Sequence, residues 1–131
     1  VICFNLIRRI GEGIDRKNCV GFDSNMKLDI AEQNLFLYPT VMVVCGDIEF
    51  SGNRADIIRN PVLIIEVLSP STEGFDRGDK FASYRSLPSF REYVLISQNK
   101  PRAEVYYKQD KNVWLYSASR GKERSFENHS A

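Results

Sequence analysis

The alternation of hydrophobic and polar positions predicts a helix followed by strands in the first third of the chain. Residues 1–17 carry apolar side chains at helical spacing, which predicts an amphipathic helix. Apolar residues at even spacing predict a strand over 22–30. We expect this strand to form an antiparallel hairpin with a second strand over 35–45, joined by the polar residues 31–34. Pro39 has no backbone donor, so it should mark a strand start, an edge or a bulge.

The pattern changes after residue 45. Residues 46–60 combine glycine, aspartate and asparagine and are expected to form a loop. Residues 62–68 are apolar except for Glu66, which is typical of a central strand covered on both faces. The later segments are expected to be a helix over 73–86, a strand over 90–97 and an aromatic-rich hairpin made by 103–108 and 112–117.

These elements predict one mixed α/β (α+β) domain. Residues 1–118 are expected to form the domain and residues 119–131 a polar, flexible tail. A chain of 131 residues has the length of one domain, and no apolar run approaches the ~20 residues of a membrane helix. We therefore expect a soluble protein.

The amino-acid composition limits the possible catalytic residue types more than it limits the possible folds. The net charge of +1 gives no field that would mark the whole chain as a nucleic-acid binder. The single histidine, His129, lies near the end of the polar tail. Histidine triads, histidine general bases and zinc-hydrolase ligand sets are therefore excluded, and any catalysis must use carboxylates and lysines.

The cysteines favour a cytoplasmic location. Cys3, Cys19 and Cys45 are odd in number and no pair has CxxC spacing, so neither a disulfide framework nor a metal knuckle is expected. Cys45 lies in an apolar stretch and is interpreted as a small buried hydrophobic residue.

Glu66 is the charged residue of the expected central strand. Burial of an unpartnered carboxylate costs several kcal/mol, so Glu66 should be protonated, ion-paired or bound to a metal. Asp76, Lys80 and Tyr84 follow at spacings of four, which places them on one face of the expected helix. Lys80 could reach the strand end, or could simply form an ordinary ion pair with Asp76 along the helix.

Several of these residues stand in motifs that resemble a known family. The motifs are YPTVMVVC at 38–45, NPVLIIEVLSPST at 60–72, Asp76 with Asp79-Lys80 and Tyr84, and Glu92-Tyr93. Together they resemble the Uma family of restriction endonucleases, in the PD-(D/E)XK nuclease superfamily. The resemblance implies a restriction-endonuclease-like core, a mixed sheet flanked by helices, that hydrolyses DNA phosphodiester bonds with a bound metal.

The resemblance also implies roles for individual residues. Magnesium or manganese would be held by the Glu66 carboxylate and the main-chain carbonyl of Val67, and would activate the attacking water. The superfamily lysine would stand at Leu68, which cannot act, and Lys80 on the following helix is expected to take its role. Asp76 and Tyr84 would support the site.

One motif position departs from the family. Thr40 stands where the family has the first metal-binding aspartate, and a neutral hydroxyl is a weak magnesium ligand. The family also carries a further segment before the first helix, which suggests a truncated chain. Activity is therefore expected to be impaired. The alternatives are a catalytically inactive nucleic-acid-binding or interaction module, and a truncated structural remnant in which Glu66 and Lys80 form an ion pair.

The expected partners are DNA and a second copy of the chain. Phosphate contacts are possible for two groups of cations, Arg8, Arg9, Arg16 and Lys17 on the first helix, and Arg77 with Lys80. Double-strand cleavage requires two sites, so the resemblance favours a homodimer, with the hairpin from Tyr106 to Tyr116 as a candidate contact surface.

Overall fold

The computed structural model describes residues 18–120. The helix expected over 1–17 and the cations placed on it lie outside the described residues, as does the tail from residue 121. The last described strand ends at Arg120, two residues beyond the expected end of the domain.

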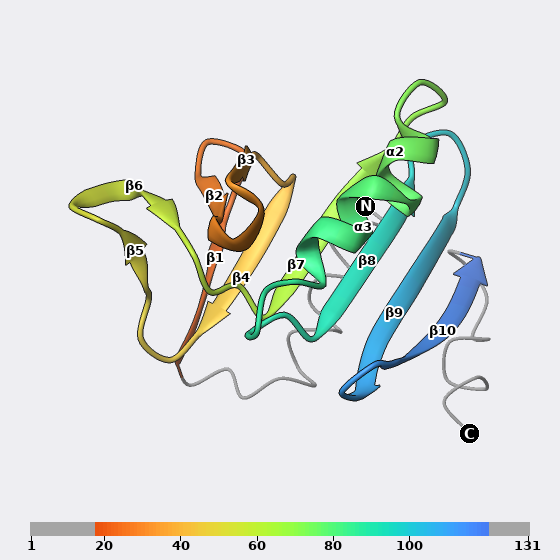
Figure 1. Ribbon diagram of the computed structural model, residues 1–131. Helices are drawn as coiled ribbons and strands as arrows, with labels where there is room; N and C mark the ends of the chain where they lie inside the picture. Colours follow the sequence, from red (N-terminus) through yellow and green to blue (C-terminus); the bar gives the residue numbers. More distant parts are fainter. Residues whose placement is uncertain (1–17, 121–131) are drawn as a thin grey trace.

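A mixed sheet of six strands is the largest element of the described region (Figure 1). Strands β7 and β8 run parallel, and every other neighbouring pair is antiparallel. In spatial order the strands are β1 (Cys19–Phe22), β4 (Val41–Cys45), β7 (Leu63–Leu68), β8 (Glu92–Ser97), β9 (Arg102–Asp110) and β10 (Val113–Arg120).

Strand β7 confirms the predicted central strand. It lies between β4 and β8, and its alternating side chains enter two different hydrophobic clusters. Leu63 and Ile65 pack on one face of the sheet, while Ile64 and Leu68 pack on the other. Glu66 shares the second face by alternation, so its carboxylate points to the side of the sheet that the helices cover.

The helix expected over 73–86 is two short helices, α2 (Glu73–Arg77) and α3 (Asp79–Tyr84), which lie over β7 and β8 in Figure 1. Gly78 separates them with a ψ of −84°, outside the helical range. A side chain at Gly78 would meet the carbonyl oxygen of Gly74 at 3.3 Å. The break reorients the chain between Asp76 and Lys80, which the sequence prediction treated as one continuous helix.

A second sheet of four described strands lies beside β4. Its order is β3 (Leu35–Leu37), β2 (Lys27–Ile30), β6 (Arg54–Ile58) and β5 (Phe50–Ser51). The hairpin between β2 and β3 is confirmed, with the 3-10 turn η2 (Ala31–Gln33) as its connection. The loop expected over 46–60 is wrong, because β5 and β6 pair there around Gly52, whose φ is +59°.

Each of the two strands expected over 22–30 and 35–45 is divided in the structure. A turn at Asp23 separates β1 from β2, where the amide of Met26 donates to the Asp23 carbonyl at 3.1 Å. Pro39 separates β3 from β4, in agreement with the prediction that it marks a strand start. The halves therefore join different sheets, and β1 pairs with β4 rather than continuing into β2.

The C-terminal hairpin is confirmed and is longer than predicted. Tyr106 stands opposite Tyr116, with ring centroids 5.0 Å apart. Phe81 of α3 stacks on Tyr93 at 4.9 Å and meets Trp114 edge-on at 5.3 Å. These aromatic contacts fix α3 against the sheet, and hence the position of Lys80 relative to Glu66.

Cys19 and Cys45 form a disulfide, so the prediction that no disulfide is present is wrong. The two residues are directly opposite in the β1–β4 ladder, with Cα atoms 4.0 Å apart. Their separation of 26 residues gave no spacing signal, because strand pairing rather than sequence proximity brings them together. Cys45 is a half-buried disulfide partner rather than a free hydrophobic side chain.

Candidate active site

The carboxylate of Glu66 is the centre of a buried polar cluster. Glu66 is 3% exposed, and within residues 18–120 donors from two chain segments, α3 and the residue before β4, reach it. Oε2 accepts from the hydroxyl of Tyr84 at 2.6 Å and from Nζ of Lys80 at 3.3 Å. Of the three alternatives for Glu66, the structure contains the ion pair with Lys80.

Lys80 bridges two carboxylates. Its ammonium lies 3.3 Å from Oε2 of Glu66 and 3.0 Å from Oδ1 of Asp76, and the side chain is 17% exposed. Burial lowers the pKa of Lys80, but the charges of Glu66 and Asp76 outweigh it, so the pKa lies above its usual value. Lys80 is thus a cation at neutral pH, able to stabilise negative charge and unable to act as a general base.

Asp76 is held at the end of α2 by contacts that sequence analysis did not reveal. Asp76 is 2% exposed, and its Oδ1 accepts no hydrogen bond from the described residues, so the charge of Lys80 is what compensates it. The hydroxyl of Tyr93 on β8 donates to the main-chain carbonyl of Asp76 at 2.7 Å. The motif residue Tyr93 therefore links the helix to the sheet directly beneath the cluster.

Tyr84 is a permanent donor to Glu66. Its side chain is fully buried, and burial first, then the charge of Glu66, raises the pKa of Tyr84 well above its usual value. The phenol therefore stays protonated and fixes the orientation of the Glu66 carboxylate.

Thr40 contacts the other oxygen of Glu66. Its hydroxyl lies 3.2 Å and its backbone amide 3.4 Å from Oε1, just before the first residue of β4. The position at which the resemblance places an aspartate is therefore in contact with Glu66, but it supplies neutral donors rather than a second carboxylate.

The donor set does not fit a resident magnesium ion. Each oxygen of Glu66 already accepts from two donors, and the Lys80 cation occupies the side of Oε2. Residues 18–120 contain no group of three or more histidine, cysteine, aspartate or glutamate side chains that could hold a metal. Val67, the expected main-chain ligand, follows Glu66 in β7 and pairs with Ile96 of β8.

A second buried ion pair lies beside the cluster and was not predicted. The guanidinium of Arg77 donates to both oxygens of the buried Glu104 on β9, with Nη1 2.6 Å from Oε1. Tyr116 donates to the same carboxylate at 2.7 Å. Arg77 therefore forms ion pairs with Glu104 and, at 2.8 Å, with Glu73, and these pairs occupy the guanidinium that was expected to contact phosphate. The sequence could have indicated a buried Glu104, because alternation along the predicted strand places Glu104 on the same face as Tyr106, which packs against the core.

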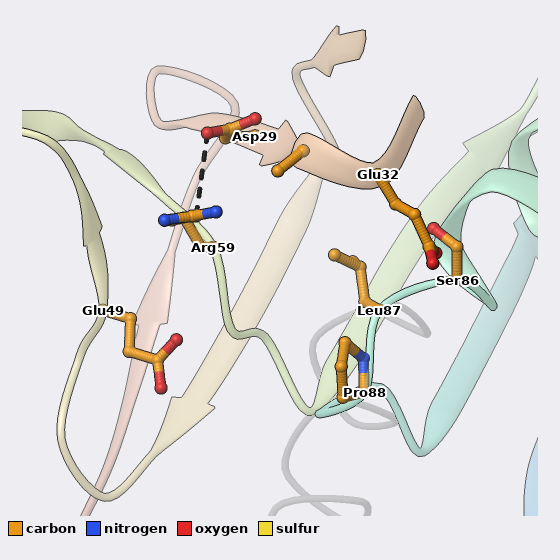
Figure 2. A pocket seen from close by; sticks show the side chains of 8 residues that line it. Asp29, Glu32, Glu49, Arg59, Ser86, Leu87 and Pro88 are labelled. Carbon is orange, nitrogen blue, oxygen red and sulfur yellow. Dashed lines mark ion pairs between the residues drawn. The ribbon is translucent and has the colours of Figure 1, made fainter. Parts of the chain in front are cut away.

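A pocket of about 380 Å³ is lined by residues of the small sheet and its connections and by residues 86–88, which follow α3 (Figure 2). Asp29 and Arg59 form an ion pair across it at 3.7 Å. Its lining residues are Asp29, Ala31, Glu32, Glu49, Arg59, Ser86, Leu87 and Pro88. None of the residues singled out in the sequence as site candidates lines this pocket.

Comparison with known structures defines the class of fold. The chain is similar to the crystal structure of "a putative nuclease belonging to DUF820" from Anabaena variabilis, with a TM-score of 0.62 and 16% identity. The similarity covers 90% of this chain and 63% of that one. The described domain is accordingly a mixed α+β, restriction-endonuclease-like core, as predicted.

Sequence comparison gives the family. Residues 1–128 match Uma2, described as "Putative restriction endonuclease", and the chain belongs to this family. It is 39% identical over 126 residues to the uncharacterized protein sll1609 of Synechocystis, covering 96% of this chain and 71% of the relative. It is 35% identical to slr1290 of the same organism, covering 81% of this chain and 56% of that relative. The chain thus spans little more than half of the length of slr1290. Within residues 18–120, no helix has the length and apolarity needed to cross a membrane.

Proposed function

We propose that the protein is a restriction-type endonuclease that hydrolyses DNA phosphodiester bonds at Glu66 and Lys80, with weak activity in this chain. The observation that carries the proposal is the meeting of three separate motif segments at one carboxylate. Lys80 of α3 lies 3.3 Å from Glu66 of β7, and Thr40 lies 3.2 Å from the same side chain. Membership of a family described as restriction endonucleases supports the same class.

The charges suggest a role for each residue. Lys80, which remains an ammonium, would stabilise the negative charge that develops on the phosphate. Glu66, oriented by Tyr84, would accept a hydrogen bond from the attacking water at Oε1, where the water would displace one of the long 3.2 and 3.4 Å contacts from Thr40. Asp76 would hold Lys80 in place from the opposite side.

The same charges account for weak activity. The two carboxylates and one ammonium leave a net negative charge in a buried site, which repels a phosphodiester. In the motif that the resemblance implies, magnesium or manganese would offset this charge, held by a second carboxylate at the position of Thr40. The hydroxyl of Thr40 supplies no charge to attract such an ion.

Nicking of supercoiled plasmid tests the proposal. We expect slow nicking by the wild-type chain with Mg²⁺ or Mn²⁺, background nicking by Glu66→Gln, and faster nicking by Thr40→Asp. The double variant Thr40→Asp/Glu66→Gln should return to background, which excludes a contaminating nuclease. Equal nicking by the wild type, Glu66→Gln and Thr40→Asp would contradict the proposed activity.

The neutral Thr40 also favours a second candidate, an inactive nuclease-like module that binds nucleic acid. Nicking by Thr40→Asp but not by the wild type would support this candidate. A third possibility, a structural remnant in which Glu66 and Lys80 only form an ion pair, predicts no nicking by either protein. Cleavage of both strands would further require a dimer, for which the β9–β10 hairpin is the candidate surface, and light scattering of the purified chain would measure its mass.

A further inference from the structure

Two aromatic rings and a lysine form an exposed surface on the small sheet beside the candidate active site. Phe36 is 48% exposed and Tyr38 is 54% exposed. They lie two residues apart in and just after β3, on the face opposite Leu35 and Leu37, which pack against the core. We call Lys27, Phe36 and Tyr38 the aromatic platform.

Lys27 connects the two rings. Its ammonium lies 5.3 Å from the centroid of Phe36 and 5.7 Å from that of Tyr38. The pairing of Leu28 with Leu37 places Lys27 directly across from Tyr38 in the same antiparallel ladder. Asp56 on β6 forms its ion pair with Arg54 at 2.8 Å, and no described carboxylate lies within ion-pair distance of Lys27.

The platform is joined to the Glu66 cluster by a very short stretch of chain. Tyr38 and Thr40 are separated only by Pro39, which is buried, and Thr40 contacts Glu66. Two residues span at most about 7 Å, so the Cα atoms of Tyr38 and Thr40 lie within that distance of each other. The proline ring fixes φ at Pro39, which restricts the backbone of this link.

From this arrangement we propose that the aromatic platform binds unpaired bases of single-stranded nucleic acid, which stack on Phe36 and Tyr38 while Lys27 contacts the backbone phosphate. Exposed rings interleaved with cations are the arrangement by which proteins bind single strands without sequence preference, because every base has a π-face. The inference rests on the proposed function, since it describes how the substrate strand would be held beside Glu66.

Binding of a fluorescein-labelled oligo(dT) strand, followed by anisotropy in EDTA, tests the platform without cleavage. Phe36→Ala and Tyr38→Ala should each weaken binding about tenfold. Tyr107→Ala is the matched control, because Tyr107 is 49% exposed on a different sheet and should leave binding unchanged. Lys27→Met should reduce the slope of log affinity against log salt by about 0.7, and Lys108→Met should not.

A strand of the same length with abasic sites separates stacking from charge. The wild type should bind it more weakly than oligo(dT), and Phe36→Ala should bind it as the wild type does. Equal affinity for the two strands, or equal losses in Phe36→Ala and Tyr107→Ala, would overturn the inference. If Phe36→Ala and Tyr38→Ala instead changed the mass of the particle in solution and left DNA binding intact, the surface would be a protein contact.

The binding assay with oligo(dT) tests the platform separately from catalysis. Glu66→Gln should bind oligo(dT) at least as tightly as the wild type, because the platform does not include Glu66 and the substitution removes a negative charge that repels phosphate. Binding without Glu66-dependent nicking would retain the platform and reject the proposed activity. Nicking that depends on Glu66, together with binding that does not depend on Phe36 or Tyr38, would retain the proposed activity and reject the platform.

Discussion

The hydroxyl of Tyr84 donates a 2.6 Å hydrogen bond to Oε2 of Glu66, the atom that also meets the ammonium of Lys80 at 3.3 Å. One carboxylate oxygen therefore receives a neutral donor and a cation, both from α3. The neutral donor is the shorter contact. Because Tyr84 is fully buried, it has no water to replace Glu66 as its partner.

Tyr84→Phe should destabilise the protein by about 1.5–3 kcal/mol, the range for a hydrogen bond to a charged group. The ring remains to fill the core, so the loss reports the hydroxyl rather than a cavity. Urea unfolding followed by circular dichroism measures the change. Tyr107→Phe, at an exposed position, is the control and should be neutral. A stability loss below 0.5 kcal/mol would show that Tyr84 does not hold Glu66.

Lys80→Met should cost about 3–5 kcal/mol, because it leaves two buried carboxylates without a cation. Adding Glu66→Gln should recover part of that loss, since it removes one of the uncompensated charges. The double-mutant cycle of Glu66→Gln and Lys80→Met should give a coupling of about 1–3 kcal/mol by urea unfolding. Additive losses would show that the 3.3 Å contact contributes no coupling.

Thr40→Asp should lower the melting temperature in EDTA and restore it in Mn²⁺. Thr40 lies 3.2 Å from Glu66, so the new carboxylate would stand beside an existing buried one and repel it. A divalent cation relieves that repulsion and stabilises the folded state by mass action. Differential scanning fluorimetry measures both shifts. Thr40→Asn, which has the same shape without the charge, should not respond to Mn²⁺, and a response equal to that of Thr40→Asp would contradict the prediction.

The sequence predicted the central part of the fold because local and global signals agree there. The apolar run around Glu66 could only be a covered strand, and the spacing of Asp76, Lys80 and Tyr84 placed them on the following helical segment. The structure brings all four residues together. A resemblance over the same motifs also identified Thr40, whose contact with Glu66 no periodicity could have revealed.

Elsewhere the pattern was ambiguous for physical reasons. Strands β5 and β6 are short and mostly exposed, so the polar residues in their sequence are also typical of a loop. The break at Gly78 is a backbone conformation, with φ −104° and ψ −84°, that the helical spacing of the side chains does not indicate. The Cys19–Cys45 bond depends on strand pairing. Such a long-range contact carries no local sequence signal.

Glu104 should make stability depend on pH in the acid range. Burial raises the pKa of Glu104, but hydrogen bonds from Arg77 and Tyr116 outweigh it, and the pKa lies below its usual value near 4.5. The unfolded chain therefore binds this proton more readily, so the contribution of Glu104 to stability is complete above pH 4.5 and disappears as the pH falls through the folded-state pKa.

Glu104→Gln tests this dependence. The variant should be less stable at neutral pH, because Arg77 loses its charged partner, and the difference from the wild type should shrink as the pH falls below 4.5. Urea unfolding at several pH values between 3 and 7 measures the difference. Glu73→Gln, which removes the more exposed partner of Arg77, should have a much smaller effect. A difference that stays constant across this range would contradict the assignment.

Reduction of the Cys19–Cys45 disulfide should lower the melting temperature. Strand β1 is at the edge of the described sheet, with β4 as its neighbour, so the bond secures an element that few other contacts retain. A closed loop of this length is worth about 3 kcal/mol in the chain-entropy model, which corresponds to roughly 10 °C for a domain of this size. Cys45→Ser should reproduce the effect of dithiothreitol, and dithiothreitol should not lower it further.

Cys3→Ser provides the matched control for this prediction. It removes the remaining cysteine and leaves the pair intact, so it should melt as the wild type does and respond equally to dithiothreitol. Peptide mapping without reductant should recover the segments around Cys19 and Cys45 as one linked species. Alkylation of all three cysteines before reduction would show that the bond does not form, and the melting temperature should then be the same with and without dithiothreitol.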